Sequence, residues 1–125
     1  MIKNEWLYGF VNGEGCFTFG GGNRISPIFT ITLRLSELEI LKEIQKKLKT
    51  GKITLHNKYN SCSLQVCSKN INIIIKYFDG KFIGDKKIDF ENWKLGIKLW
   101  ESNNHKYSEE LYNKINKLMP KYRHI

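Results

Sequence analysis

The chain has 125 residues, which suits one compact domain over residues 1–125. Hydrophobic residues make up 41% of the chain and aromatic residues 13%, enough to fill a core, so an intrinsically disordered protein is excluded. Lys and Arg number 21 against 12 Asp and Glu, and the net charge of +9 favours nucleic acid over an acidic membrane surface as the partner. No apolar run exceeds that of Ile73 to Ile75, which is far too short to cross a bilayer, so no membrane partner is expected.

The N-terminal segment predicts a helix followed by a β-hairpin. Asn4 is a capping-type residue, and apolar side chains follow it at helical spacing until the run ends near Gly15. The period changes to two over residues 16–19, and the same alternation returns over 26–34. Glycines and an asparagine at 20–23 have little side chain to pack, so they predict the turn between the two strands.

The middle of the chain repeats this order. Ser36 and Glu39 form a capping box, and apolar residues recur at helical spacing until Gly51 ends the run. Residues 52–56 and 61–67 alternate with a period of two. They predict a second hairpin, in which the apolar side chains of both strands are buried.

The remaining segments predict helices over 71–78, 89–100 and 108–119, the last of which is stopped by Pro120. The order is αββαββ followed by helices. It predicts an α+β fold, in which helices cover one face of a four-stranded antiparallel, saddle-shaped sheet. The tryptophans lie at helical spacing and are expected to pack in the core: Trp6, Trp93 and Trp100.

The uncovered face of the predicted sheet is polar and basic. Its hydroxyl, amide, imidazole and guanidinium groups can read base edges, and a twisted β-ribbon fits the major groove of DNA. A plainer interpretation is that any antiparallel sheet covered on one side shows water a polar face. The positive net charge favours the first interpretation, because it attracts phosphates, and so makes the two equally good. The residues predicted to contact DNA are Thr18, Arg24, Ser26, Ile28, Thr30, Thr32, Arg34, Lys52, Thr54, His56, Ser61, Ser63 and Gln65.

Residues 7–17, LYGFVNGEGCF, combine small residues with an acid at the expected end of the first helix. Gly9 and Gly13, four residues apart, would let two such helices approach closely, and Glu14 would lie directly before the first strand. This segment resembles the signature of the LAGLIDADG homing endonucleases. The resemblance extends to the order of the elements and covers most of the chain. The residues predicted for the interface between two such helices are Leu7, Gly9, Phe10 and Gly13.

The resemblance implies a site-specific endonuclease that hydrolyses double-stranded DNA with Mg²⁺ or Mn²⁺, and Glu14 as its catalytic acid and metal ligand. It also implies the carbonyl of Gly13 as a further metal ligand. The chain carries one motif, like the single-motif members that act as homodimers on near-palindromic sites. Two copies of Glu14 would then form a shared metal site. The alternative is an ordinary helix-end carboxylate, although an acid at a helix C-terminus opposes the helix dipole.

Family members also use a basic residue near the site, and residues 82–90 resemble that stretch. Lys86 is predicted to fill this role, with Lys87 second, because a lysine there could polarise water or stabilise the transition state. A solvated lysine pair before a helix is nearly as good an interpretation. Asn12 stands where many members have a non-catalytic acid. Some members have a glutamine near the end of the second strand, where this chain has Thr32, Leu33 and Arg34 instead, so no residue is assigned a water-ordering role there.

Rival functions on the same scaffold are an RNA-binding intron maturase and a DNA-binding protein that does not cleave. A different single-motif chain as partner is a third possibility. Heavy use of Lys, Ile and Asn, with no Ala, indicates AT-rich coding, and no import signal is visible. Both features favour a protein encoded in an organelle, the mitochondrion first. Three cysteines without a CxxC pair predict reduced thiols.

Overall fold

The computed structural model describes residues 2–20 and 25–120. Within these residues, four strands form one antiparallel sheet in the order β1-β2-β4-β3. The strands are β1 (Gly15–Phe19), β2 (Pro27–Arg34), β3 (Lys52–His56) and β4 (Ser61–Cys67). Both predicted hairpins are confirmed, and they join in the middle of the sheet, where β2 pairs with β4. The two hairpins turn at opposite ends of the sheet.

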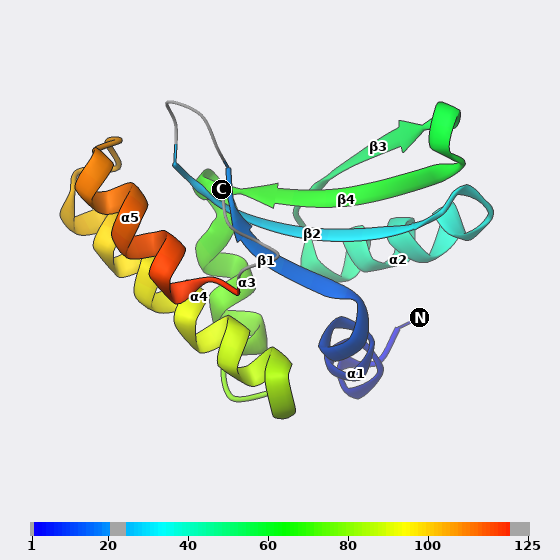
Figure 1. Ribbon diagram of the computed structural model, residues 1–125. Coiled ribbons are helices and arrows are strands. Elements are labelled where there is room, and N and C mark those ends of the chain that lie inside the picture. The colour runs from blue at the N-terminus through cyan, green and yellow to red at the C-terminus, as the bar shows by residue number, and fades with distance from the viewer. Residues whose placement is uncertain (1, 21–24, 121–125) are drawn as a thin grey trace.

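Figure 1 shows the helices on one side of the sheet, with its other face uncovered. The helices are α1 (Asn4–Glu14), α2 (Leu38–Leu48), α3 (Ile71–Phe78), α4 (Gly84–Ser102) and α5 (Glu109–Leu118). This arrangement confirms the predicted α+β fold class. None of the described helices combines the length and the apolar character that a bilayer crossing requires.

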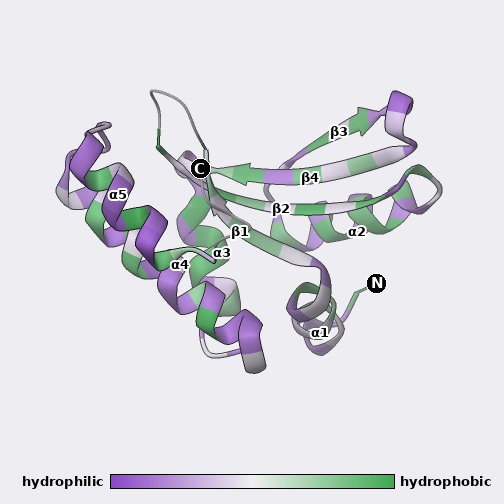
Figure 2. Ribbon diagram, viewed as in Figure 1, coloured by the Kyte–Doolittle hydropathy of each residue, from purple (hydrophilic) through white to green (hydrophobic). Residues whose placement is uncertain are grey.

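The core lies between the sheet and the helices. Apolar and polar residues alternate along much of β2 and β4 in Figure 2, and the apolar ones, Ile28 and Cys67 excepted, face the helices. Phe17 of β1 lies at the centre, with its ring against those of Phe29, Phe90 and Trp93. The indole Nε1 of Trp93 also donates a hydrogen bond of 2.8 Å to the carbonyl of Thr18. The longest helix, α4, is thereby fixed to the first strand.

The capping predictions for the first two helices are wrong. Lys3, not Asn4, precedes α1, and the Asn4 side chain accepts a hydrogen bond of 2.6 Å from the Tyr77 hydroxyl. The proposed capping box over 36–39 instead includes the end of a short 3-10 turn, and no side chain caps α2. In both places a tertiary or local backbone contact replaces the capping bond that the residue types favour.

Two further predictions need correction. Helix α4 begins at Gly84, before the predicted residue 89, because the polar residues of its first turn hide the apolar spacing. Leu55 on β3 is exposed rather than buried. Strand β3 lies at the edge of the sheet, and the helices cover only part of it.

Candidate active site and nucleic-acid interface

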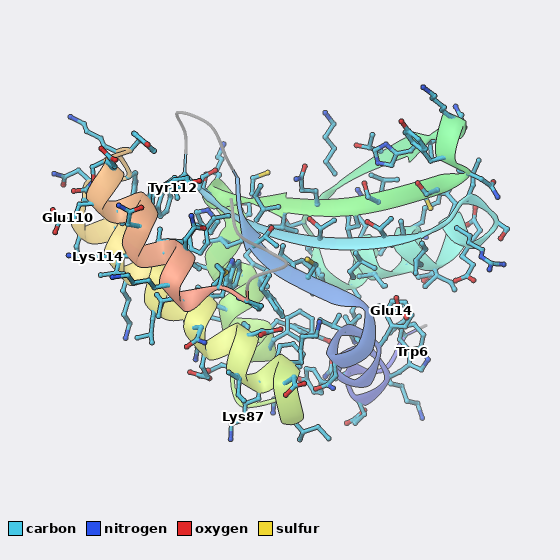
Figure 3. The ribbon with its side chains drawn as sticks, viewed as in Figure 1. Trp6, Glu14, Lys87, Glu110, Tyr112 and Lys114 are labelled. Atoms are coloured by element: carbon cyan, nitrogen blue, oxygen red, sulfur yellow. The ribbon has the colours of Figure 1, made fainter. Side chains whose placement is uncertain are left out.

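The predicted catalytic acid lies at a sharp junction between a helix and a strand. Helix α1 ends at Glu14 and β1 begins at Gly15, with no loop between them. A Cβ on Gly15 would lie 2.5 Å from Val11 Cγ1 and 2.9 Å from the Val11 carbonyl oxygen, so only glycine fits there. This tight turn leaves the Glu14 side chain exposed at the start of the first strand (Figure 3).

The structure separates the two candidate lysines. The Lys86 Nζ donates a hydrogen bond to the carbonyl oxygen of Gly15, and the side chain is half-buried. Lys87 is exposed, and Figure 3 shows it pointing away from Glu14 at the start of α4. Lys86 is therefore the lysine that lies beside the acid-bearing end of α1.

A second bond joins the same two elements. The Asn12 Oδ1 accepts a hydrogen bond of 2.9 Å from the backbone N–H of Ile83, the residue that precedes α4. Asn12 thus ties the start of α4 to α1, and its side chain already has a structural partner.

Glu14 opens onto a surface hollow of about 420 Å³. The hollow is also lined by Arg34 at the end of β2, by Glu37, and by Tyr59 from the turn of the second hairpin. Sequence reasoning missed Glu37 and Tyr59, because both lie outside regular strands. The strand pairing could have located them, since Arg34 pairs with Ser61 and so brings the two hairpins together there.

Beneath this hollow lies the thiol of Cys62. Burial, followed by the charge of Glu37, raises the pKa of this thiol above its ordinary value. It stays protonated at neutral pH, and it donates a hydrogen bond of 3.4 Å to the carbonyl of Arg34. A buried, protonated thiol is a poor nucleophile, so Cys62 is a packing residue.

The strand register brings the predicted DNA-contacting residues onto one face. Residues paired across an antiparallel ladder point to the same side of the sheet. The pairing gives rows across the uncovered face: His56, Ser61 and Arg34; Thr54, Ser63 and Thr32; Lys52, Gln65, Thr30 and Cys16; and Cys67, Ile28 and Thr18. We call this surface the open face. The rows begin beside Glu14 and end near the turn of the first hairpin.

One residue of that prediction, Ser26, lies outside the four rows, and a second cannot be placed. Ser26 precedes β2, and its carbonyl accepts a hydrogen bond of 2.8 Å from the Gly20 N–H. Arg24 lies outside the described residues. Cys16 and Cys67 belong to the open face, although they were not among the predicted contacts. His56 and Ser63 are already joined there, with 3.0 Å between Nε2 and Oγ.

The outer side of α1 differs from the predicted interface. Leu7 is fully buried in the core of its own chain, so it cannot contact a second helix, and its assignment to the interface is wrong. Gly9 and Gly13 are exposed, and a Cβ on either would meet no described atom within 4 Å. The helical spacing predicts which residues share a side, but it does not say which side faces the core.

Trp6 was expected in the core, yet 45% of its surface is exposed. Its ring stacks on that of Phe10, with 4.8 Å between the centroids and 10° between the planes. Figure 3 shows Trp6 beside α1, outside the core. Trp93 and Trp100 are buried, as predicted.

The donors at the end of α1 suit a hard divalent cation. The Glu14 carboxylate and the Gly13 carbonyl offer oxygen atoms, which Mg²⁺ and Mn²⁺ prefer. The last carbonyls of a helix lack intrahelical partners and form the negative end of its dipole, which also favours a cation. Across residues 2–20 and 25–120, no three His, Cys, Asp or Glu side chains gather into a metal site.

These features agree with a family-level comparison. The sequence model of the LAGLIDADG endonuclease family matches residues 7–97, from within α1 into α4. The chain belongs to this family. The match confirms the resemblance of the 7–17 segment, and it takes in the open face, Asn12, Glu14 and Lys86.

Two curated proteins are similar to this LAGLIDADG chain. A Podospora anserina protein, named "Uncharacterized 50.9 kDa protein in ND4 intron 1", is 28% identical over 80% of the chain and 25% of its own length. A Mycosarcoma maydis protein, named "Probable intron-encoded DNA endonuclease 1", is 36% identical over 42% of the chain and 20% of its own length. The chain thus spans a quarter or less of these relatives.

A solved LAGLIDADG structure has the same fold. The meganuclease I-CpaMI, bound to uncleaved DNA, is 26% identical and aligns with a TM-score of 0.84 over 96% of this chain. The alignment covers 46% of the I-CpaMI chain, which is therefore about twice as long.

Proposed function

We propose that two copies of this chain form a site-specific endonuclease that cleaves double-stranded DNA at a near-palindromic target. One observation carries the proposal. Glu14 lies where the open face of the sheet meets the side of α1 that bears Gly9 and Gly13. A carboxylate at this point would be close both to DNA on the sheet and to a second copy of the helix.

The exposed side of α1 supports the homodimer. Because Gly9 and Gly13 carry no side chain, a second α1 could approach closely there, with the stacked rings of Trp6 and Phe10 beside it. A two-fold axis that runs along the pair of helices would bring their equivalent ends together. The I-CpaMI chain is long enough to hold a second copy of this fold, and a homodimer would likewise bring two copies together.

The metal-binding residues would be Glu14 and the carbonyl of Gly13 from each copy. When bound, Mg²⁺ or Mn²⁺ activates water and neutralises charge on the scissile phosphate. Lys86 would hold its positive charge beside Gly15 and stabilise the negative charge that develops there. Glu14 would accept no proton in this scheme, because its role requires the ionised carboxylate.

The open face would read the target. From Arg34 to Ile28, the strand extends about 20 Å at its usual rise per residue, a length of about six base pairs. Hydroxyl, amide and guanidinium groups on it can bond to base edges, and the Ile28 side chain suits a thymine methyl. Lysines around this face add attraction to phosphates.

We also infer that the protein is encoded within an intron of an organelle genome, the mitochondrial one first. The Podospora anserina relative in ND4 intron 1 supports this origin, as does the AT-rich composition.

The test uses a plasmid that carries the flanking sequences of the reading frame, joined without the intron. We expect the wild-type protein with Mg²⁺ to linearise this plasmid. It should not cut a second plasmid, in which the intron still separates the two flanking sequences. Glu14→Gln should bind the same DNA without cutting it. If neither protein cuts, and both bind intron RNA equally in a salt-dependent way, the maturase function replaces this proposal.

The homodimer has a separate test. Sedimentation of the purified protein alone should show a dimer. A monomer at all concentrations, together with cleavage only after another LAGLIDADG chain is added, would support the mixed pair instead.

A further inference from the structure

Two hydrogen bonds join the junction of α1 and β1 to the start of α4, one on either side of Glu14 in the sequence. Before Glu14, the Asn12 Oδ1 accepts from the Ile83 N–H at 2.9 Å. After it, the Gly15 carbonyl accepts from the Lys86 Nζ. The acid is thus bracketed by two contacts with one short stretch of chain, residues 83–86.

The backbone of that stretch explains how the two bonds are coupled. Ile83 has an extended conformation, with φ −130° and ψ 161°, and α4 begins at the next residue. Lys86 therefore lies in the first turn of α4. A bond that fixes the Ile83 amide also fixes the direction in which this first turn presents its side chains.

Side-chain packing alone does not fix Ile83. Its own side chain is 76% exposed, so no core contact holds it. The preceding residue, Phe82, is buried among Phe17, Phe78 and Phe90, which fixes the depth of the segment. The hydrogen bond to the Asn12 side-chain amide then sets the orientation of the peptide group between Phe82 and Ile83.

We propose that Asn12 is a positioning residue, which holds the start of α4 so that the Lys86 ammonium lies beside the Glu14 end of α1. The proposal rests on the endonuclease function proposed above, and it deepens it by naming the group that orients the lysine. What the position supplies is an acceptor oxygen for the Ile83 N–H. A carboxylate oxygen at position 12 could accept the same bond.

The experiment compares Asn12→Leu, which removes the acceptor at similar size, with Asn12→Asp, which keeps it. Asn103→Leu is the matched control, because the Asn103 Nδ2 donates a bond of 2.8 Å to the Lys106 carbonyl at the far end of α4. We expect Asn12→Leu to lower the single-turnover cleavage rate about 10- to 100-fold. Its DNA affinity should stay within about twofold of wild type, since Asn12 is not on the open face.

A double-mutant cycle shows whether Asn12 acts through Lys86. In a Lys86→Ala background, Asn12→Leu should cause little further loss of cleavage rate. As a single substitution, Asn12→Asp should retain most of the wild-type cleavage rate. Asn103→Leu should cleave like wild type. Three outcomes would overturn the proposal. The rate losses of Asn12→Leu and Lys86→Ala could be fully additive, Asn12→Asp could lose as much rate as Asn12→Leu, or Asn103→Leu could lose an equal amount.

Two readouts do not depend on cleavage. Asn12→Leu should speed hydrogen exchange at the Ile83 amide, and it should raise the rate at which an amine-acylating reagent labels Lys86 relative to Lys87. Unchanged exchange and labelling would overturn the positioning role. If the wild-type protein cuts no plasmid while both readouts change as expected, the failure lies with the endonuclease function and not with the Asn12 contact.

Discussion

The ammonium of Lys86 donates a hydrogen bond to the carbonyl of Gly15, the residue that follows Glu14. This contact links a residue of the fourth helix to the helix-strand junction that carries the acid. It gives the two neighbouring lysines different expected roles, although the sequence makes them look equivalent.

We expect Lys86→Ala to lower the cleavage rate by about 10²-fold, because a preorganised cation that stabilises developing charge is lost. Lys87→Ala should change the rate by less than about twofold, because an exposed lysine contributes mainly long-range attraction. Single-turnover cleavage of the joined-flank plasmid measures both. Equal effects of the two substitutions would contradict the assignment.

A second prediction concerns the glycines of α1. Gly9→Leu adds a side chain at an exposed position, where its Cβ would meet no described atom within 4 Å. The isolated fold should be as stable as wild type, or more stable by about 0.5–1 kcal/mol, because leucine favours a helix over glycine. The dimer should dissociate, and cleavage should fall with it. Sedimentation and thermal unfolding measure these two effects separately.

Gly96→Ala provides the matched control. A Cβ at Gly96 would lie 2.8 Å from Phe19 Cζ, inside the core. This variant should lose about 1–3 kcal/mol of stability through overpacking, with little effect on association of the folded chains. A Gly9→Leu protein that remains dimeric and active would exclude α1 as the interface.

A third prediction assigns positions along the target. Arg34 lies in the row beside Glu14, and Ile28 lies in the row farthest from it. Arg34→Ala should relax base preference near the cleavage point by about 1–3 kcal/mol, or about 10- to 100-fold. Ile28→Ala should relax it at outer positions instead. Cleavage of a library of singly substituted targets measures both profiles.

Lys98→Ala serves as the control for this experiment, because Lys98 is an exposed residue of α4, outside the open face. It should leave both profiles unchanged. Outer positions that respond to Arg34→Ala, or inner ones that respond to Ile28→Ala, would reverse the proposed orientation of the sheet on DNA.

A fourth prediction concerns pH and the ion pair that holds the segment before α4. The Lys94 Nζ lies 2.7 Å from Asp79 Oδ1 and 3.0 Å from Glu91 Oε1. The hydrogen bond from Lys94, and then its charge, lower the pKa of Asp79 below the ordinary 3.8. Burial lowers the pKa of Lys94, but bonds and charges from Asp79 and Glu91 outweigh it, so the net shift is above the ordinary 10.5.

The signs of these shifts define two pH windows. The contribution of Asp79 to the free energy of unfolding is complete above pH 3.8, and it is lost as the pH falls through the lowered pKa. That of Lys94 is complete below pH 10.5, and it is lost as the pH rises through the raised pKa. Asp79→Asn should therefore be less stable than wild type at neutral pH, with a gap that closes in strong acid.

Urea unfolding across the pH range measures the difference in the free energy of unfolding between wild type and Asp79→Asn. The control is Glu110→Gln, which breaks an exposed pair with Lys114 on the outer surface of α5. It should change the free energy of unfolding by less than about 1 kcal/mol at any pH. A gap for Asp79→Asn that stays constant below pH 3 would contradict the role of the ion pair.

The sequence was sufficient for the parts of the fold that depend on periodicity. Strand β4 and helix α3 begin and end where the alternation and the helical spacing predicted. Leu7 and Trp6 show where periodicity fails, because both lie on α1 and only the packing of the whole chain decides which one is covered. Asn4 shows the same for a cap, since its partner Tyr77 is distant in sequence.

In the candidate site too, the features with a local cause could be predicted from the sequence, and those set by tertiary packing could not. Glu14 and Gly15 could be found from the motif, because the steric requirement at their junction is local. The choice between Lys86 and Lys87 could not, since it depends on the angle at which α4 approaches α1. The contact between Asn12 and Ile83 was also invisible, because nothing in either residue type points to the other.

Because the hairpins turn at opposite ends of the sheet, their two connections lie at different distances from Glu14. Under the proposed function, exchanging the connection between β1 and β2, which is remote from Glu14, should leave the chemistry untouched. The connection between β3 and β4, which contributes Tyr59 to the hollow beside Glu14, could not be exchanged so freely. A protein engineer would therefore begin a library at the first of these connections.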